Sequence, residues 1–376
     1  MAFKDIHKLK KIQEIQKENI ETDFLVLGHD LFSLSLYHDL VKKYGEDKVR
    51  FLSQEKFEKK DLAPKGPSGV RGLDNMNFIR SHYSENQFEI IDQPSQFYKD
   101  MQWKVFGGRS KSEALKFHEE HFTTGRIDIR FEEIFSFINQ EGFIDWLNER
   151  VYAVKVKSIF YNNDEKKFIV ECVNGTEFVT NELICGVSPA EFLNFYKNKN
   201  ELSDQFIQFS EGTHSPSALY MKFDYKKPLT DMKESLFIPL SYTHEWGHFM
   251  GEFRNSGDQQ SVDFVHFIDK DHTTEEDVSR IIRLLKKNLE KIFQQPKNVP
   301  VKEYISIEDA SGCLKIDDEL FNNSEVQFKN LHFIGLNAPL AVASSTETAF
   351  AYSLSSLNYE ARALMSVRLL QEKLLN

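Results

Sequence analysis

The fold is decided by the stretch Asp23-Phe24-Leu25-Val26-Leu27-Gly28-His29-Asp30-Leu31-Phe32-Ser33. Its apolar run predicts a buried strand, Gly28 predicts a tight turn, and the residues that follow predict the start of a helix. This is the order of parts in a Rossmann-type dinucleotide-binding unit. In that unit the first glycine makes the turn, the second lets the backbone approach the pyrophosphate, and the third lets helix and strand pack closely.

The turn departs from this pattern where a cofactor would lie. Gly28 keeps the first glycine, and Ser33 is small enough for the third. Asp30 stands in place of the second, where a carboxylate adds bulk and repels a pyrophosphate. His29 lies inside the same turn, and Ser53 ends the next predicted strand, where an acid usually binds ribose hydroxyls. The sequence therefore predicts the scaffold of a nucleotide site with altered chemistry.

Composition restricts the class of protein. With 376 residues, 40% hydrophobic content and 33 Phe, the chain has enough apolar material for one large or two interleaved domains. The net charge of -11 argues against nucleic acid as a partner, because phosphate binding needs a concentrated basic face. Cys172, Cys185 and Cys313 stand in apolar runs, which predicts buried thiols in a reducing compartment. No apolar run reaches membrane-spanning length and no secretory signal is recognised, so a cytoplasmic location is expected.

The spacing of apolar residues predicts the elements along the chain. An amphipathic helix over residues 3–20 either packs on its own domain or contacts a membrane surface or a partner. Asn174-Gly175 predicts a type I′ hairpin turn, and Ser188-Pro189 predicts an N-cap and first helical turn. Further helices are predicted at 32–43, 131–139, 273–293 and 345–376. Strands are predicted at 23–27, 48–52, 151–161, 168–173, 176–179, 182–187 and 330–335, with several more between 215 and 268. Residues 61–75 are predicted to form an irregular loop.

The order of these parts resembles the flavin-dependent amine oxidase superfamily, which includes protoporphyrinogen oxidase-like and phytoene desaturase-like enzymes. Four places, which together span nearly the whole chain, carry the resemblance: Phe24 to Ser33, the Asn174-Gly175 hairpin followed by Leu183 to Phe192, the helix at 273–293, and Leu331-His332-Phe333-Ile334-Gly335 with Ser345-Thr346-Glu347-Thr348-Ala349.

The resemblance implies an α/β fold in which a Rossmann-like FAD-binding-type domain with a parallel sheet is interleaved with a mixed α+β substrate-type domain. It places the FAD-binding-type domain in residues 22–75, 150–212 and 325–376. The substrate-type domain then comprises residues 76–149 and 213–324, and residues 1–21 form the N-terminal amphipathic helix.

Compared with the family pattern, the last unit also departs at positions that face the cofactor. Gly335 matches the glycine after the family's final strand, but Leu336 stands where an acid usually binds a flavin phosphate or ribitol group. Thr348 takes the place of a glycine where the final helix starts against the flavin. Residues at positions that pack in the core therefore match the family pattern, whereas residues at positions that bind the cofactor differ from it. This is expected of a fold that is retained after its cofactor is lost.

Two functions follow from the resemblance. One is an FAD-dependent oxidoreductase with a degenerate cofactor site, in which hydride passes from a small or apolar substrate to the flavin ring, and no residue is assigned as catalytic. The other is a cofactor-free protein that acts by binding or as a scaffold, similar to the Rab GDP-dissociation inhibitors. Gly69-Val70-Arg71-Gly72 is either a remnant of the family's Gly-Gly-Arg loop over the flavin or a surface turn.

A competing motif, His244-Glu245-Trp246-Gly247-His248, satisfies the zinc-hydrolase pattern H-E-x-x-H. On a helix the two histidines lie on one face, about 6 Å apart, and can bind one metal ion. On a strand they lie about 13 Å apart, which is too far. The glycines of this region and the alternating pattern from Phe249 to Phe253 favour a β-hairpin, so a zinc hydrolase remains the remote alternative and no metal ligand is assigned.

Overall fold

The computed structural model describes residues 18–63, 65–105, 122–213, 217–239, 249–268, 274–294, 301–308, 321, 328–339 and 359–376. Five features predicted from the sequence lie outside the described residues: residues 1–17 of the N-terminal helix, the H-E-x-x-H motif, Cys313, Thr348 and the start of the last helix. Residues 19–21, which the prediction assigned to the N-terminal helix, instead begin strand β1 (Asn19–Leu27).

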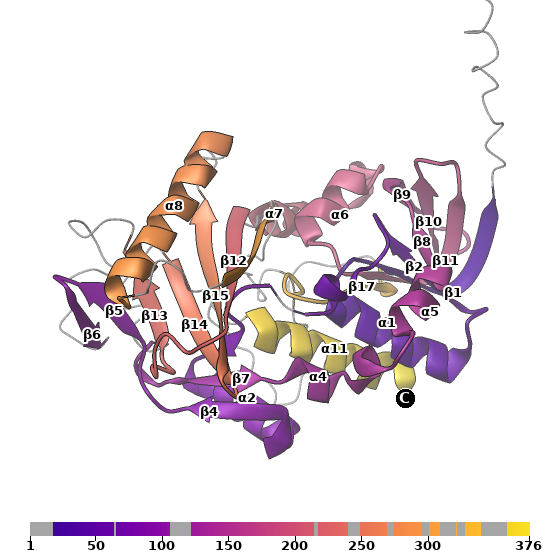
Figure 1. The fold of residues 1–376 in the computed structure, drawn as a ribbon. Helices are drawn as coiled ribbons and strands as arrows, with labels where there is room; N and C mark the ends of the chain where they lie inside the picture. The colour runs from indigo at the N-terminus through magenta and orange to yellow at the C-terminus, as the bar shows by residue number, and fades with distance from the viewer. Residues whose placement is uncertain are drawn as a thin grey trace, which may run out of the picture.

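The first of three sheets is Rossmann-like, which confirms the predicted α/β class (Figure 1). Its strand order is β8-β2-β1-β11-β10-β9, and β17 pairs with the carboxyl end of β11. Strands β8, β2, β1, β11 and β17 run parallel, whereas β9, β10 and β11 form an antiparallel meander. The bounds are β1 Asn19–Leu27, β2 Val49–Ser53, β8 Val151–Ala153, β9 Val156–Asn162, β10 Lys167–Cys172, β11 Glu177–Cys185 and β17 Leu331–Phe333.

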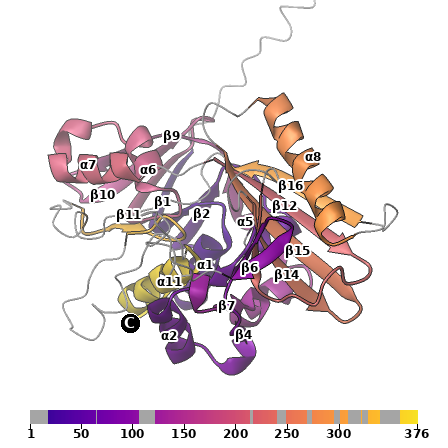
Figure 2. The same ribbon diagram turned by 90° about the vertical axis from the view of Figure 1, so that its left-hand side faces the viewer.

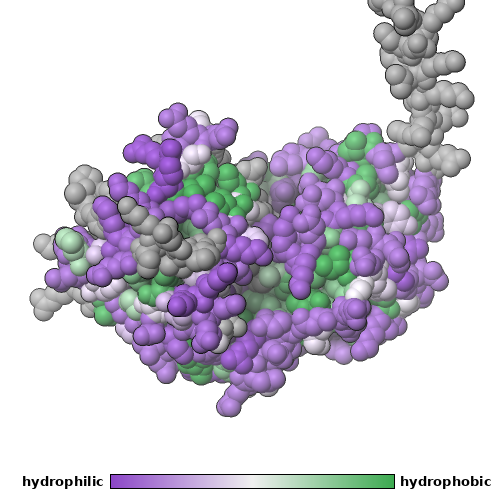
Figure 3. All heavy atoms as spheres, viewed as in Figure 1, coloured by the Kyte–Doolittle hydropathy of each residue, from purple (hydrophilic) through white to green (hydrophobic). Residues whose placement is uncertain are grey.

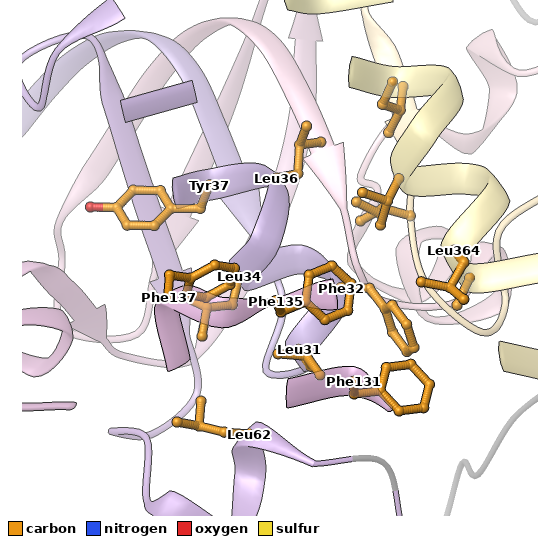
Figure 4. Packing of buried hydrophobic residues seen from close by; sticks show 14 of the residues in the cluster. Leu31, Phe32, Leu34, Leu36, Tyr37, Leu62, Phe131, Phe135, Phe137 and Leu364 are labelled. Atoms are coloured by element: carbon orange, nitrogen blue, oxygen red, sulfur yellow. The ribbon is translucent and has the colours of Figure 1, made fainter. Parts of the chain in front are cut away.

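Helices α1 (Leu31–Tyr44) and α11 (Tyr359–Leu375) lie side by side against this sheet (Figure 1). The Tyr44 hydroxyl donates to the carbonyl of Leu374 at 2.6 Å. Beneath them Phe32 packs edge-to-face on Phe131, with ring centroids 5.9 Å apart, in a core that Leu364 of α11 completes (Figure 4). Burial of such large apolar side chains fixes the start of α1 against the sheet.

The second sheet has the order β16-β12-β15-β14-β13-β5-β6, and α8 (Glu275–Ile292) crosses one of its faces (Figure 2). The helix buries Leu285 and Leu289 against the sheet. On the surface, hydrophilic residues cover most of the face of the molecule seen in Figure 3. The bounds are β5 Gln96–Lys99, β6 Gln102–Val105, β12 Ser217–Tyr225, β13 Ser235–Ile238, β14 Phe249–Ser256, β15 Gln259–Ile268 and β16 Val301–Glu308.

The third sheet has three short antiparallel strands in the order β3-β7-β4. Their bounds are β3 Gly69–Val70, β4 Phe88–Ile91 and β7 Arg126–Ile129. The remaining helices are α2 Leu73–His82, α4 Phe131–Ile134, α5 Phe143–Arg150, α6 Pro189–Phe195 and α7 Asp204–Gly212, with 3-10 turns at Lys59–Leu62, Glu85–Gln87, Ser136–Asn139 and Lys199–Glu201.

Several local predictions need correction. The strand predicted at 151–161 is divided into β8 and β9, and those predicted at 176–179 and 182–187 form the single strand β11. Residues 61–75 are not entirely irregular, because Gly69–Val70 pairs with β7 and α2 begins at Leu73. The helix predicted at 131–139 is split into α4 and a 3-10 turn. The hairpin at Asn174-Gly175 is confirmed, but its turn is not type I′: only Gly175 has a positive φ, and the Asn174 side chain accepts from the Thr176 amide at 3.1 Å.

Candidate functional site

The candidate site lies at the carboxyl edge of the parallel sheet, where ligands of open α/β folds bind. Gly28 follows β1, Gly186 follows β11, and Gly335 comes two residues after β17. Ser53 ends β2 at the same edge. Parallel pairing therefore brings together Gly28, Ser53 and Gly335, three of the positions predicted from distant parts of the sequence.

Asp30 is the N-cap of α1 and occupies the donors at the start of this helix. Its Oδ1 accepts from the backbone amides of Phe32 and Ser33 at 2.9 and 3.0 Å, and its Oδ2 accepts from the Ser33 hydroxyl at 2.5 Å. Amides at a helix N-terminus are the groups that bind a phosphate in dinucleotide sites. In this chain they bind the protein's own carboxylate.

Gly28 and Gly186 make room for the Ser33 and Asp30 side chains, and Gly335 lies beside Asp30. A Cβ built on Gly186 would lie 2.0 Å from Ser33 Oγ and 2.9 Å from Asp30 Oδ2. A Cβ on Gly28 would lie 2.6 Å from Ser33 Oγ, and one on Gly335, where φ is +95°, 3.6 Å from Asp30 Oδ1. The space that glycines leave for a cofactor in a dinucleotide site is thus filled by two side chains of the turn itself.

Burial and hydrogen bonding act in opposite directions on the Asp30 carboxyl. Burial raises the pKa of the Asp30 carboxyl, while the hydrogen bonds from Ser33 and Phe32 and the nearby His29 oppose this shift. The hydrogen bonds from the helix amides and the Ser33 hydroxyl favour the charged carboxylate, whereas burial disfavours it.

His29 and Ser53 bond to each other at the place where ribose hydroxyls were expected. His29 Nδ1 lies 2.7 Å from Ser53 Oγ, and the imidazole stacks on Phe57 with centroids 4.3 Å apart. His29 Nε2 lies 3.5 Å from Asp61 Oδ2 and 3.8 Å from Glu55 Oε1. Asp61 was not singled out from the sequence, because it belongs to the segment predicted as a loop.

The residues after β17 likewise make their contacts inside the protein. The Gly335 amide donates to Ser366 Oγ of α11 at 3.0 Å. Leu336 is half-buried and packs against the core formed by α1 and α11. A side chain that packs in this way supplies no charge or acceptor to a cofactor.

Gly69-Val70-Arg71-Gly72 is not a surface turn, since Val70 and Arg71 are buried and Gly69–Val70 forms β3. The Arg71 guanidinium donates to the Gly69 carbonyl at 2.8 Å and to Ser235 Oγ at 2.6 Å, and it forms an ion pair with Glu252. The loop therefore directs its arginine to the second sheet.

Glu252 of β14 was missed by sequence reasoning, although the alternation of Phe249, Gly251 and Phe253 places it on the opposite face of that strand. Its side chain is fully buried. Burial alone would raise the pKa of Glu252, but Arg126, Arg71 and Arg254 hold it well below its usual range. Glu252 is thus a buried carboxylate held in its charged form by arginines.

Comparison with known proteins identifies the fold. Neither a family model nor a curated protein matches the chain. Solved structures do: an oxidoreductase from Methanosarcina mazei is 11% identical, with a TM-score of 0.54 over 93% of this chain and 100% of that one. A protoporphyrinogen oxidase-like protein from Exiguobacterium is 7% identical, with a TM-score of 0.56 over 94% and 99%. Cyclohexylamine oxidase from Brevibacterium oxydans is 10% identical, with a TM-score of 0.55 over 94% and 100%.

The chain has the amine oxidase fold. At these identities the likeness establishes the fold alone, and it confirms the resemblance predicted from the order of the motifs at that level.

We call the turn and helix start formed by Gly28, Asp30 and Ser33, with Gly186 and Gly335 beside them, the cradle. In this chain the cradle does not fit the pyrophosphate of FAD. The helix amides are bonded to Asp30, the space beside Gly28 and Gly186 is filled by Ser33 and Asp30, and Leu336 packs against the core. We therefore derive no chemical step through FAD.

Two further findings concern membrane-spanning helices and metal ligands. None of the described helices is both long and apolar enough to span a membrane. Within the described ranges, no group of three His, Cys, Asp or Glu side chains is placed to hold a metal ion. Cys172 and Cys185 are buried as predicted, and burial raises the pKa of the Cys172 thiol to about 11.

Proposed function

We propose that this chain is a cofactor-free protein with the amine oxidase fold that acts by binding a ligand or a partner. One observation carries the proposal: the carboxylate of Asp30 takes the helix amides that would bind the pyrophosphate. The bond between His29 and Ser53 and the packing of Leu336 support it, because both occupy further cofactor-facing positions internally.

The magnitudes favour exclusion of the cofactor. An N-cap contributes only about 1 kcal/mol, so the cap alone would not resist a tightly bound cofactor. Repulsion between a carboxylate and a phosphate 4 Å apart is about 4 kcal/mol at the effective dielectric of a protein surface. The Asp30 carboxylate is bonded to the amides of Phe32 and Ser33 and to the Ser33 hydroxyl, so it would have to leave these partners to make room for a phosphate. FAD would have to displace or neutralise Asp30 before binding.

An FAD-dependent oxidoreductase is the second candidate, favoured by the likeness to oxidases over more than nine-tenths of the chain. In that case the flavin would accept hydride from a small or apolar substrate. The protein would have to move Asp30 away from the amides of Phe32 and Ser33.

Flavin binding by the purified full chain separates the two candidates. We expect no flavin absorption in the protein as isolated, and no heat of binding when FAD is added in a calorimeter. Asp30→Gly should bind FAD more tightly than the parent, since it restores the second glycine of the turn and removes the charge. Asp47→Gly, at an exposed acid away from the cradle, is the matched control and should not bind FAD.

Stoichiometric flavin in the unmodified protein would overturn the proposal in favour of the oxidoreductase. If Asp30→Gly binds no more FAD than the control, Asp30 is not the group that excludes the cofactor.

A further inference from the structure

A second anionic group is enclosed far from the cradle in sequence. The side chain of Glu252, on β14 of the second sheet, has no exposed surface. Its Oε2 accepts from the backbone amides of Ser68 and Gly69, each at 3.1 Å. Two successive amides directed at one oxygen form the kind of concave donor pair that binds anions in proteins.

Three arginines complete the enclosure of the Glu252 carboxylate. Arg71 forms an ion pair with Oε1, Arg126 Nε lies 3.6 Å from Oε1, and the Arg254 guanidinium donates to Oε2 at 3.1 Å. Ser235 Oγ donates to Oε1 at 3.3 Å. Both oxygens are therefore surrounded by donors, most of them charged or from the backbone.

Two of these arginines also have a carboxylate of their own. Arg126 Nε bonds to Asp128 Oδ1 at 2.6 Å, and the Arg254 guanidinium bonds to Asp263 Oδ2 at 3.3 Å. Glu252 is thus the third acid among three arginines, and it is the one that meets the backbone amides. The amides and guanidinium groups form a site for one carboxylate, which the side chain of Glu252 fills.

The occupant and part of its site come from different sheets. Ser68, Gly69 and Arg71 belong to the segment that follows the βαβ unit of the Rossmann-like sheet and leads through β3, whereas Glu252 belongs to the second sheet. The carboxylate therefore joins segments that are more than 180 residues apart in the chain.

We propose that Ser68, Gly69, Arg71, Arg126 and Arg254 form a carboxylate-binding site whose occupant is the chain's own Glu252 side chain, and that a free small monocarboxylate binds there once this side chain is shortened. The ligand class follows from the donors, since planar guanidinium groups match the two oxygens of a carboxylate.

The test is chemical rescue of Glu252→Ala in the full chain. We expect 100 mM sodium acetate to raise the Tm of this variant by about 2 °C or more relative to sodium chloride at equal ionic strength, because a ligand that binds only the folded state stabilises it. Acetate should not raise the Tm of the unmodified protein. Glu303→Ala removes another acid of the second sheet, which pairs with Lys286, and should show no rescue.

A second variant keeps the test decisive. Glu252→Gln removes the charge but fills the space, so acetate should leave its Tm unchanged. If Glu252→Ala folds only in acetate, the proposal is supported. If it folds in neither salt, or if acetate has the same effect on Glu252→Ala and Glu252→Gln, the site does not bind a free carboxylate and the proposal is overturned.

Discussion

Asp30 acts first as a helix cap, and this role can be measured apart from any cofactor. Replacing Asp30 by Ala should lower the free energy of unfolding by about 1–3 kcal/mol, because the amides of Phe32 and Ser33 lose their acceptor in a partly buried place. Asp30→Asn keeps one acceptor oxygen and should lose less. Urea denaturation provides the measurement, with Asp47→Ala as the exposed control; an Ala variant as stable as the parent would show that water satisfies these amides.

Glu360, in the first turn of α11, is a buried acid close to the charges around Glu252. Burial, with a further contribution from Glu252, raises the pKa of Glu360 to about 7, although Arg71 and Arg254 oppose this shift. Since the folded pKa lies above the unfolded value of 4.5, the folded state keeps a proton that the unfolded state loses. Stability linked to this group is therefore full below pH 4.5 and is lost as the pH rises through 7.

The difference of 2.5 pKa units, from 4.5 to about 7, corresponds to a loss of roughly 3 kcal/mol above pH 7. Glu360→Gln should remove this loss, so that the variant is as stable as the parent at pH 4 and more stable at pH 8. Urea denaturation at both values checks the prediction. Equal stability of the two proteins at pH 8 would mean that Glu360 ionises without cost.

At the scale of elements, the junction of β1, β11 and α1 depends on a contact that sequence alone does not show. A Cβ on Gly186 would lie 2.0 Å from Ser33 Oγ and 3.1 Å from the Leu27 carbonyl. Gly186→Ala should therefore cost about 1–3 kcal/mol by overpacking. In a Ser33→Ala background the cost should fall by about 1 kcal/mol, and the rest should persist because the backbone contact remains.

The control for this pair is Gly212→Ala, since nothing lies within 4 Å of a Cβ built on Gly212. This change should be neutral or slightly stabilising in α7. Thermal unfolding of the single and double variants gives the coupling. A strictly additive cost for Gly186→Ala and Ser33→Ala would remove the contact from the explanation.

Elements whose signals are local could be predicted from the sequence, and those that depend on distant partners could not. The βαβ unit and α8 were predicted because apolar spacing and the Thr274 cap mark them. β3 was missed because two residues become a strand only by pairing with β7, more than 50 residues away. The role of Glu252 was missed for the same reason, since its donors come from separate segments of the chain.

At the scale of the whole molecule, the two internal anions have one physical role: each accepts hydrogen bonds from a pair of successive backbone amides inside the chain. Asp30 does so at the carboxyl edge of the Rossmann-like sheet, and Glu252 does so where β3 meets the second sheet. Buried donors that have no acceptor are costly. Two carboxylates supplied by the chain remove that cost without an external group.

Charge balance around Glu252 gives a prediction for the molecule as a unit. Glu252→Met should lower the free energy of unfolding by about 3–5 kcal/mol, because Arg71, Arg126 and Arg254 then have only Asp128 and Asp263 as ion-pair partners. Adding Arg71→Met should recover part of the loss, since Arg126 then keeps Asp128 and Arg254 keeps Asp263. Urea denaturation of the two single variants and the double variant measures the coupling. If the double variant is destabilised by the full sum of the single changes, Arg71 and Glu252 do not act as a pair.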